Sequence, residues 1–216
     1  MDVHLASGLR QEVNLSNEPS RNKSARNLRD LRNLGDLRDM ARTLQRRLHG
    51  RRPHFAAGHL LWVVSKRPLL AIDGTFHLGK RVIWRSPRTR VWVTVAKGAT
   101  LTIGDRVLLN EGVNISCYCN ISIGENTQIA DFTTIYDTNF HRVSPDSDVI
   151  IAPVVIGKNV WIGARTIVLP GVTIGDHSVI AAGSIVREDI PSRSVAVGVP
   201  ARVVSNFECP DDWRRS

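Results

Sequence analysis

Long apolar runs are missing from this chain of 216 residues. A membrane-spanning helix needs about 20 consecutive apolar residues, and the best candidate, residues 55–64, is short and interrupted by His59. The first 20 residues carry three acidic side chains and no apolar core, so no secretory signal peptide is predicted. We therefore expect a cytoplasmic protein, with at most peripheral contact with a membrane.

Cysteine is also scarce. The three cysteines, Cys117, Cys119 and Cys209, are too few for the paired framework of a disulfide-stapled domain. Cys117 and Cys119 have no second Cys or His pair at the spacing of a zinc finger. We expect them to serve in packing, and we expect no bound metal.

Acidic residues are scarce in one part of the chain. The net charge is +9, and residues 1–52 hold 12 Lys and Arg against 6 Asp and Glu. A basic segment of this kind is compatible with nucleic acid, an anionic lipid surface or a phosphate-bearing ligand. Charge alone does not choose among these partners.

Two segments make up the N-terminal quarter. Residues 1–20 are polar and aperiodic, which predicts a disordered tail. Residues 21–52 predict a basic amphipathic helical arm, because apolar residues recur every three or four positions. We expect this stripe to pack on the body or on a sister subunit; an interfacial membrane helix is the alternative, and no nucleic-acid partner is expected. The stripe consists of Leu28, Leu31, Leu34, Leu37, Met40, Leu44 and Leu48.

A six-residue period dominates residues 95–190, after irregular lead-in strands predicted over residues 53–94. A helix repeats every 3.6 residues and a strand every 2, so a period of six fits a short strand plus a corner. Hexapeptide repeats are a β-helix signature, and three of them close one coil of about 18 residues. The aliphatic anchors are Ile103, Leu109, Ile115, Ile123, Ile129, Ile135, Ile156, Ile162, Val168, Ile174, Ile180 and Val186.

The repeat is interrupted in two ways. Val95, Leu101 and Ile103 recur as Ile115, Ile121 and Ile123, a spacing of 20 residues. Ile135 and Ile156 are 21 residues apart, which places an insertion at residues 136–155. Long insertions in a regular solenoid commonly carry function, so we predict a catalytic loop there. Residues 191–216 form a C-terminal segment.

An ordered series of motifs accompanies the repeat. The insertion opens with an Asp-x-x-Phe-His sequence, Asp137 to His141. In this order the motifs resemble the hexapeptide-repeat acetyltransferases, similar to galactoside, maltose and xenobiotic acetyltransferases and to polysaccharide O-acetyltransferases, over residues 95–205. The motifs that follow are Val160-Trp161-Ile162-Gly163-Ala164, Pro170-Gly171-Val172, Ile180-Ala181-Ala182-Gly183-Ser184-Ile185-Val186 and Gly198-Val199-Pro200-Ala201-Arg202.

The resemblance implies a fold, partners and site residues. The fold is a mainly β, left-handed parallel β-helix with an N-terminal α-helical extension, assembled as a homotrimer. Acetyl-CoA or another acyl-CoA lies between neighbouring subunits, and His141 is the general base. Asn114, Asn139 and Trp161 are expected at the acceptor. The expected cofactor contacts are Trp161, Gly163, Ala164, Ala182, Arg187 and Arg202.

The chemistry is consistent with this assignment. An imidazole with a pKa near 6.5 can take the proton of a hydroxyl as it attacks a thioester. Asp137 could orient that imidazole, contact the acceptor or cap the turn, while His177 is expected to face solvent. We therefore predict an acyltransferase that moves an acetyl or other acyl group from acyl-CoA to a hydroxyl, preferably of a sugar or glycan.

Three alternative functions are compatible with a prism of this kind. N-acetylation of an amino sugar or another small amine would use the same site. A non-enzymatic trimeric scaffold or binding module would leave the loop histidine without a role. A zinc carbonic anhydrase on the same prism is disfavoured, because it needs three His ligands and residues 95–190 contain only His141 and His177.

Overall fold

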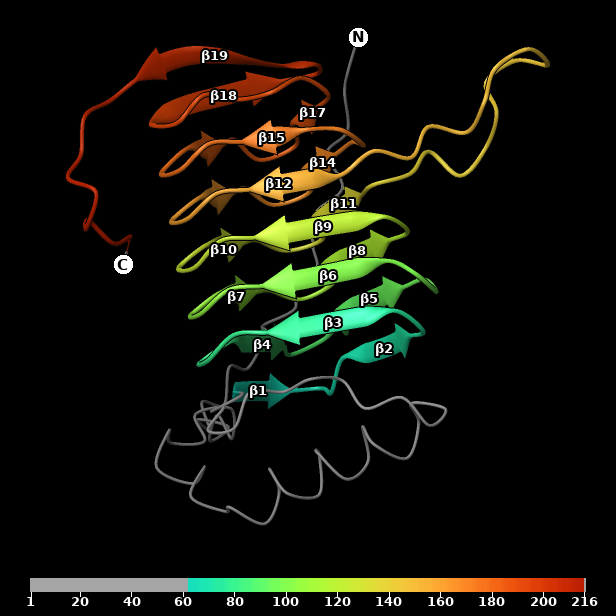
Figure 1. Ribbon diagram of the computed structural model, residues 1–216. Helices are drawn as coiled ribbons and strands as arrows, with labels where there is room; N and C mark the ends of the chain where they lie inside the picture. Colours follow the sequence, from blue (N-terminus) through green and yellow to red (C-terminus); the bar gives the residue numbers. More distant parts are fainter. Residues whose placement is uncertain (1–61, 216) are drawn as a thin grey trace, which may run out of the picture.

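A computed structural model describes residues 62–215, which form a stack of coils (Figure 1). Each coil runs through short strands that pair in parallel with the coils below and above, and only the final pair, β18 and β19, is antiparallel. The predicted parallel β-helix is confirmed. The predicted tail (1–20) and helical arm (21–52) lie outside the described residues.

The strands stack into three sheets, one for each face of a triangular prism. Sheet A contains β3 (Thr75–Leu78), β6 (Thr100–Ile103), β9 (Asn120–Ile123), β12 (Val154–Ile156) and β15 (Thr173–Ile174). Sheet B contains β1 (Trp62–Ser65), β4 (Ile83–Ser86), β7 (Leu108–Leu109), β10 (Gln128–Ile129), β13 (Trp161–Ile162), β16 (Val179–Ile180), β18 (Ser194–Gly198) and β19 (Ala201–Asn206). Sheet C contains β2 (Leu69–Ile72), β5 (Trp92–Val95), β8 (Asn114–Cys117), β11 (Thr134–Tyr136), β14 (Ile167–Val168) and β17 (Ile185–Val186).

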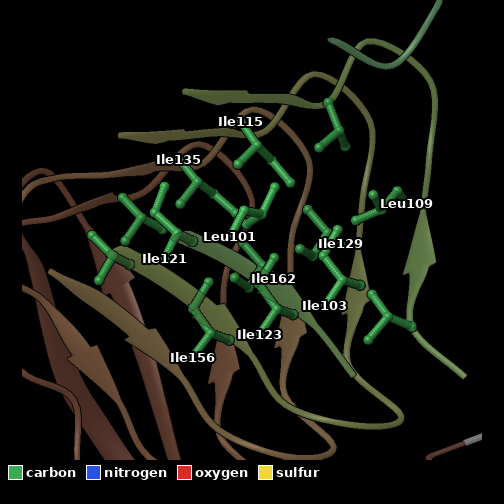
Figure 2. Packing of buried hydrophobic residues seen from close by; sticks show 14 of the residues in the cluster. Leu101, Ile103, Leu109, Ile115, Ile121, Ile123, Ile129, Ile135, Ile156 and Ile162 are labelled. Carbon is green, nitrogen blue, oxygen red and sulfur yellow. The ribbon is translucent and has the colours of Figure 1, made fainter. Parts of the chain in front are cut away.

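The hexad anchors point inward and stack on one another (Figure 2). Leu101 is in register with Ile121, and Ile103 is in register with Ile123, so each anchor lies on the anchor of the next coil. All four side chains are essentially fully buried. Burial of one such side chain is worth about 1.5–3 kcal/mol, and the ladder repeats this contribution in every coil. The stacked aliphatic core therefore holds the prism together.

The coils begin earlier than the hexads predict. Residues 53–94 read as irregular lead-in strands, but β2 to β5 already lie in register within the sheets: Leu70 pairs with Val93, and Phe76 with Leu101. The corners here are longer, so paired residues are 23 to 25 positions apart and the six-residue spacing is lost. One register also differs from the sequence-based repeat, because Val95 pairs with Cys117.

A C-terminal strap, residues 207–215, descends beside the corner between sheets A and B (Figure 1). The Asn159 amide nitrogen donates to the carbonyl of Trp213 at 3.0 Å, and its oxygen accepts from the backbone N–H of Arg215 at 2.8 Å. The Trp213 ring stacks on His177 with a centroid distance of 6.2 Å. The expectation that His177 faces solvent is wrong: the strap covers it, and its side chain is buried.

Burial of His177 makes a prediction about pH. Its Nδ1 accepts from the Asn159 amide at 2.9 Å, and its buried Nε2 has no hydrogen-bond partner within residues 62–215. Burial, followed by the positive charges of Arg193 and Lys158, lowers the pKa of His177 against the opposing pull of Asp176 and Asp211. As the pH falls, His177 therefore becomes protonated in the unfolded chain at a higher pH than in the folded chain. The contribution of His177 to the free energy of unfolding is therefore fully present above about pH 6.5, and it is lost as the pH drops below that value.

Urea unfolding at pH 7.5 and pH 5.5 checks this expectation. The wild type should lose more stability between the two values than His177→Asn, a substitution that suits the left-handed φ of 65° at this position. His77→Asn, which alters an exposed histidine on sheet A, serves as the control and should behave like the wild type. An equal loss of stability in His177→Asn and the wild type would contradict the assignment.

Candidate active site

A long loop, residues 137–153, leaves the stack at the corner between sheets C and A (Figure 1). It follows β11 and returns into β12, where the sequence predicted the insertion. Its two arms are tied at the root: Thr138 bridges Ile151, and the Ala152 N–H donates to the carbonyl of Asp137 at 3.0 Å. Beyond this root the loop projects from the prism, so it can present side chains outside the coil stack.

Asp137 fixes the root to the coil below. Its carboxylate is buried and accepts two hydrogen bonds of 2.7 Å, from the backbone N–H groups of Tyr118 and Cys119. Those residues form the turn between β8 and β9. Because both carboxylate oxygens are engaged by backbone, the geometry favours the turn-capping role of Asp137 among the three that the sequence left open.

Removal of one charge-assisted bond tests this role. Asp137→Asn places an amide against a backbone N–H that needs an acceptor, and an unsatisfied buried group costs about 1–3 kcal/mol. We expect thermal or urea unfolding to show a loss of that size. Asp146→Asn, an exposed carboxylate of the same loop, is the control and should change stability little. Wild-type stability in Asp137→Asn would exclude the capping role.

His141 and two of the three residues expected at the acceptor, Asn114 and Asn139, lie around this loop root, whereas Trp161 lies on sheet B. His141 is exposed, and its backbone N–H donates to the carbonyl of Asn139 at 2.8 Å. Asn114 lies on the outer face of β8, where its amide nitrogen is 3.5 Å from the Tyr136 hydroxyl. Asn139 has a structural contact, because its side-chain oxygen accepts from the Ile150 N–H at 2.9 Å. Its side chain thus ties the two arms of the loop together.

An aromatic cluster lies beside these residues and was not anticipated from the sequence. The ring of Phe140 meets the edges or faces of Tyr118 and Tyr136 at centroid distances of 5.3 and 5.4 Å. Tyr118 comes from the turn capped by Asp137, and Tyr136 ends β11. Only the Phe that precedes His141 belongs to a sequence motif. Tyr118 lies in a turn and Tyr136 ends a strand, and neither position carries a local signal for the cluster.

The expected cofactor residues form a second group, at the corner between sheets B and C. Trp161 lies on the outer face of sheet B and is 46% exposed. Gly163 lies directly under Ala182, since a Cβ on Gly163 would come within 2.4 Å of the Ala182 nitrogen. The Ala164 carbonyl accepts from the N–H of Gly183 at 2.8 Å. Glycine at position 163 therefore lets the two coils approach closely at this corner, and Gly163 itself is buried.

The two expected cofactor arginines meet near the last coils. Arg202 lies on β19 and Arg187 follows β17, and both are exposed. Glu188 joins them: it lies 3.0 Å from the Arg202 guanidinium and 3.4 Å from that of Arg187. Two guanidinium groups that share one carboxylate retain a net positive charge, which suits a phosphate-bearing group.

Residues 62–215 contain no group of three or more His, Cys, Asp or Glu side chains arranged to hold a metal.

Cys117 is buried, and burial together with the nearby Asp137 charge raises the pKa of its thiol to about 12. That thiol stays protonated at neutral pH and is a poor nucleophile. Helices long and apolar enough to cross a membrane are likewise absent from this part of the chain.

Comparisons with known proteins agree with the fold. The family model of the bacterial transferase hexapeptide (six repeats) matches residues 153–188. The chain is 42% identical over 117 residues to galactoside O-acetyltransferase of Escherichia coli strain K12, covering 53% of this chain and 58% of that protein. It is 37% identical over 115 residues to the putative lipopolysaccharide biosynthesis O-acetyl transferase WbbJ of the same strain, covering 48% and 59%.

A solved structure extends the match. The hexapeptide-repeat acetyltransferase VCA0836 of Vibrio cholerae O1 biovar eltor, complexed with acetyl coenzyme A, is 31% identical with a TM-score of 0.54. The match covers 62% of this chain and 72% of that one. The chain belongs to the family of hexapeptide-repeat acetyltransferases. It spans 58% and 59% of the length of the two curated relatives.

Proposed function

We propose that the protein transfers an acetyl group from acetyl-CoA to a hydroxyl group of a sugar or glycan, with His141 as the general base. One observation carries this proposal: the loop inserted into the coil stack presents an exposed imidazole at His141, directly after Phe140, whose ring packs on Tyr136 next to Asn114. The names of the relatives, a galactoside and a lipopolysaccharide O-acetyltransferase and a structure with acetyl coenzyme A, support the acyl donor and the acceptor class.

The reaction needs no group beyond this chain and its two substrates. The imidazole of His141 takes the proton of the acceptor hydroxyl while that oxygen attacks the thioester carbonyl. The tetrahedral intermediate then collapses, the C–S bond breaks, and the imidazolium returns its proton to the leaving thiolate. The products are an acetyl ester and free coenzyme A. In this proposal Asn114 holds the acceptor, while Asp137 and Asn139 hold the loop root.

A homotrimer is part of the proposal, because the two residue groups lie at opposite edges of sheet C. Such a strand spans roughly 10–13 Å, and the loop projects away from the stack (Figure 1). A general base must approach its proton within about 3 Å. The loop of one subunit would therefore work against the Gly163 and Ala182 corner of a neighbour, where the pantetheine arm would lie, with Trp161 at the thioester and Arg187 and Arg202 at the nucleotide end.

Contact with a membrane is a separate element of the proposal. The basic arm predicted over residues 21–52 carries enough positive charge to favour an anionic surface. Such contact would bring the enzyme to a lipid-linked glycan. Sedimentation with anionic and neutral vesicles tests it: binding to the anionic vesicles alone, lost when residues 1–52 are removed, supports the contact.

The proposed function is tested by measuring coenzyme A release from acetyl-CoA with a panel of acceptors. The panel contains simple galactosides, glucosides, oligosaccharides and amino sugars, and the acetylated product is identified by mass. Ester formation on a sugar hydroxyl supports the proposal. Amide formation on an amino sugar would assign the N-acetyltransferase alternative. Thioester cleavage that no acceptor in the panel accounts for would overturn the assignment of the acceptor. The absence of any thioester cleavage would overturn the assignment of the activity.

A further inference from the structure

The backbone of Phe140 adopts a conformation that its side chain disfavours. Its φ is +62°, in the left-handed region where the Cβ of most residues crowds the backbone. Glycine would adopt this conformation freely, and asparagine at a small cost. Strain of this kind persists where surrounding contacts hold the residue in place, and it concentrates at functional sites. Eight other non-Gly residues, Phe132 among them, have a similar φ, but all of them lie in turns at the corners of the coils. The backbone alone therefore does not distinguish Phe140, and the contacts of its ring carry the inference.

The ring makes two edge-to-face contacts. Its plane is tilted 88° to that of Tyr118 and 81° to that of Tyr136, with centroids 5.3 and 5.4 Å away. This is the geometry that aromatic pairs prefer. Phe140 remains 40% exposed, so its ring packs on the outside of the prism and adds nothing to the stacked aliphatic core. Its packing serves the loop.

Both tyrosines are held by the prism. The N–H of Tyr118 is bound by the Asp137 carboxylate, and Tyr136 is the last residue of β11, with its hydroxyl next to Asn114. The N–H of Phe140 donates to the Thr138 hydroxyl at 3.1 Å. The residue that follows is His141. Past it, residues 142–146 are all exposed, and their printed contacts stay within the loop, with Ser147 and Asp148. The contacts that join His141 to the prism are therefore made on the Phe140 side.

We propose that Phe140 is a positioning residue, and that Phe140, Tyr118 and Tyr136 form an aromatic clamp that aims His141 at the acceptor. The inference rests on the proposed function. The left-handed backbone at Phe140 reverses the chain and turns His141 outward, while the two tyrosines prevent the reversed segment from swinging. The clamp also joins the loop to Asn114 through Tyr136, so the base and the acceptor contact share one support.

Four variants test the clamp by steady-state kinetics. Phe140→Ala and Phe140→Gly should each lower kcat by roughly 10- to 100-fold, because small displacements of a catalytic group are costly, with KM for acetyl-CoA within about twofold of the wild type. Phe140→Tyr should retain most of the wild-type kcat, because it keeps the ring. Val143→Ala, in the exposed part of the same loop, is the matched control and should match the wild type.

The glycine variant separates the ring from the backbone. Glycine adopts a φ of +62° without strain, so wild-type kcat in Phe140→Gly would show that the backbone turn suffices and would overturn the clamp. A fall in kcat that is matched by a rise in KM for acetyl-CoA would point to a disturbed cofactor site and would overturn it as well.

A second measurement does not depend on activity. Limited trypsin digestion of the full chain, followed by mass spectrometry, reports cleavage after the exposed Arg142. Cleavage should be at least about fivefold faster in Phe140→Ala and Phe140→Gly than in the wild type or Phe140→Tyr, since loss of buried contacts promotes local opening. Unchanged cleavage overturns the clamp. An inactive wild type with faster cleavage in the variants would instead reject the proposed function and retain the clamp.

Discussion

His141→Ala should lower kcat for acetyl transfer by roughly 10²–10⁴-fold, the usual contribution of a general base. The side chain is exposed at the start of the projecting part of the loop and packs into no part of the aliphatic core. The coil stack should therefore remain intact, and with it the trimer that we propose. The loss should appear in kcat with little change in KM for acetyl-CoA, because the expected cofactor contacts lie at another corner.

Release of the coenzyme A thiol, followed with a chromogenic disulfide, measures this loss. His77→Ala, an exposed histidine on the outer face of sheet A, controls for the removal of an imidazole elsewhere and should leave turnover unchanged. Thermal unfolding and sedimentation of His141→Ala should match those of the wild type. Full turnover in His141→Ala would remove the base from the mechanism, whatever the acceptor is.

Gly124→Val should unfold the protein or lower its melting temperature by about 10 °C or more. A Cβ at Gly124 would lie 2.5 Å from the carbonyl carbon of Gly157 and 2.6 Å from the backbone nitrogen of Lys158. Both atoms belong to the backbone of the next coil, which cannot move without breaking the ladder. Overpacking usually costs about 1–3 kcal/mol and more where nothing yields, and each kcal/mol lowers the melting temperature by about 2–4 °C in a body of this size.

Calorimetry or circular dichroism on heating records the effect. Gly98→Asn is the matched control: no atom approaches its Cβ position within 4 Å, and asparagine tolerates its φ of +85° better than other residues. We expect that variant to lose little stability. A Gly124→Val protein that melts with the wild type would mean that the coils are not stacked as closely as the register between β9 and β12 requires.

The fold was predictable where the corners are short. From Ile123 onward, apart from the inserted loop, anchors recur at six residues because corner and strand lengths are constant, and the period alone defines the β-helix. Between Leu69 and Val95 the corners are longer, so the same three-sided path leaves no fixed period. A pattern search therefore sees irregular strands there, although the backbone pairing is as regular as in the later coils.

The site was predictable in part. His141 could be proposed because an insertion that breaks a strict period is itself a local signal; the structure places it in the projecting loop, and its role as a base stays a prediction. Asp137 could not be assigned one role, since its partners Tyr118 and Cys119 lie a full coil earlier in the chain. His177 was expected in solvent because its own hexad leaves it at a corner, and only the strap from Trp213 and Arg215 covers it. Contacts between segments that are far apart in the chain cannot be predicted from the spacing of residues within one repeat.

The register of the sheets bears on how the chain is made. Each strand of the stack pairs only with neighbouring coils, about 20 residues away where no insertion intervenes, so a coil that leaves the ribosome can dock at once on the one before it. Domains commonly fold in this N-terminal-first order during synthesis. The strap is different, because the carbonyl of Arg215 binds Gln128 across a separation of 87 residues. His177 therefore stays uncovered until Trp213 and Arg215 have left the ribosome. A nascent chain that stalls before Trp213 would present an open corner to chaperones and proteases.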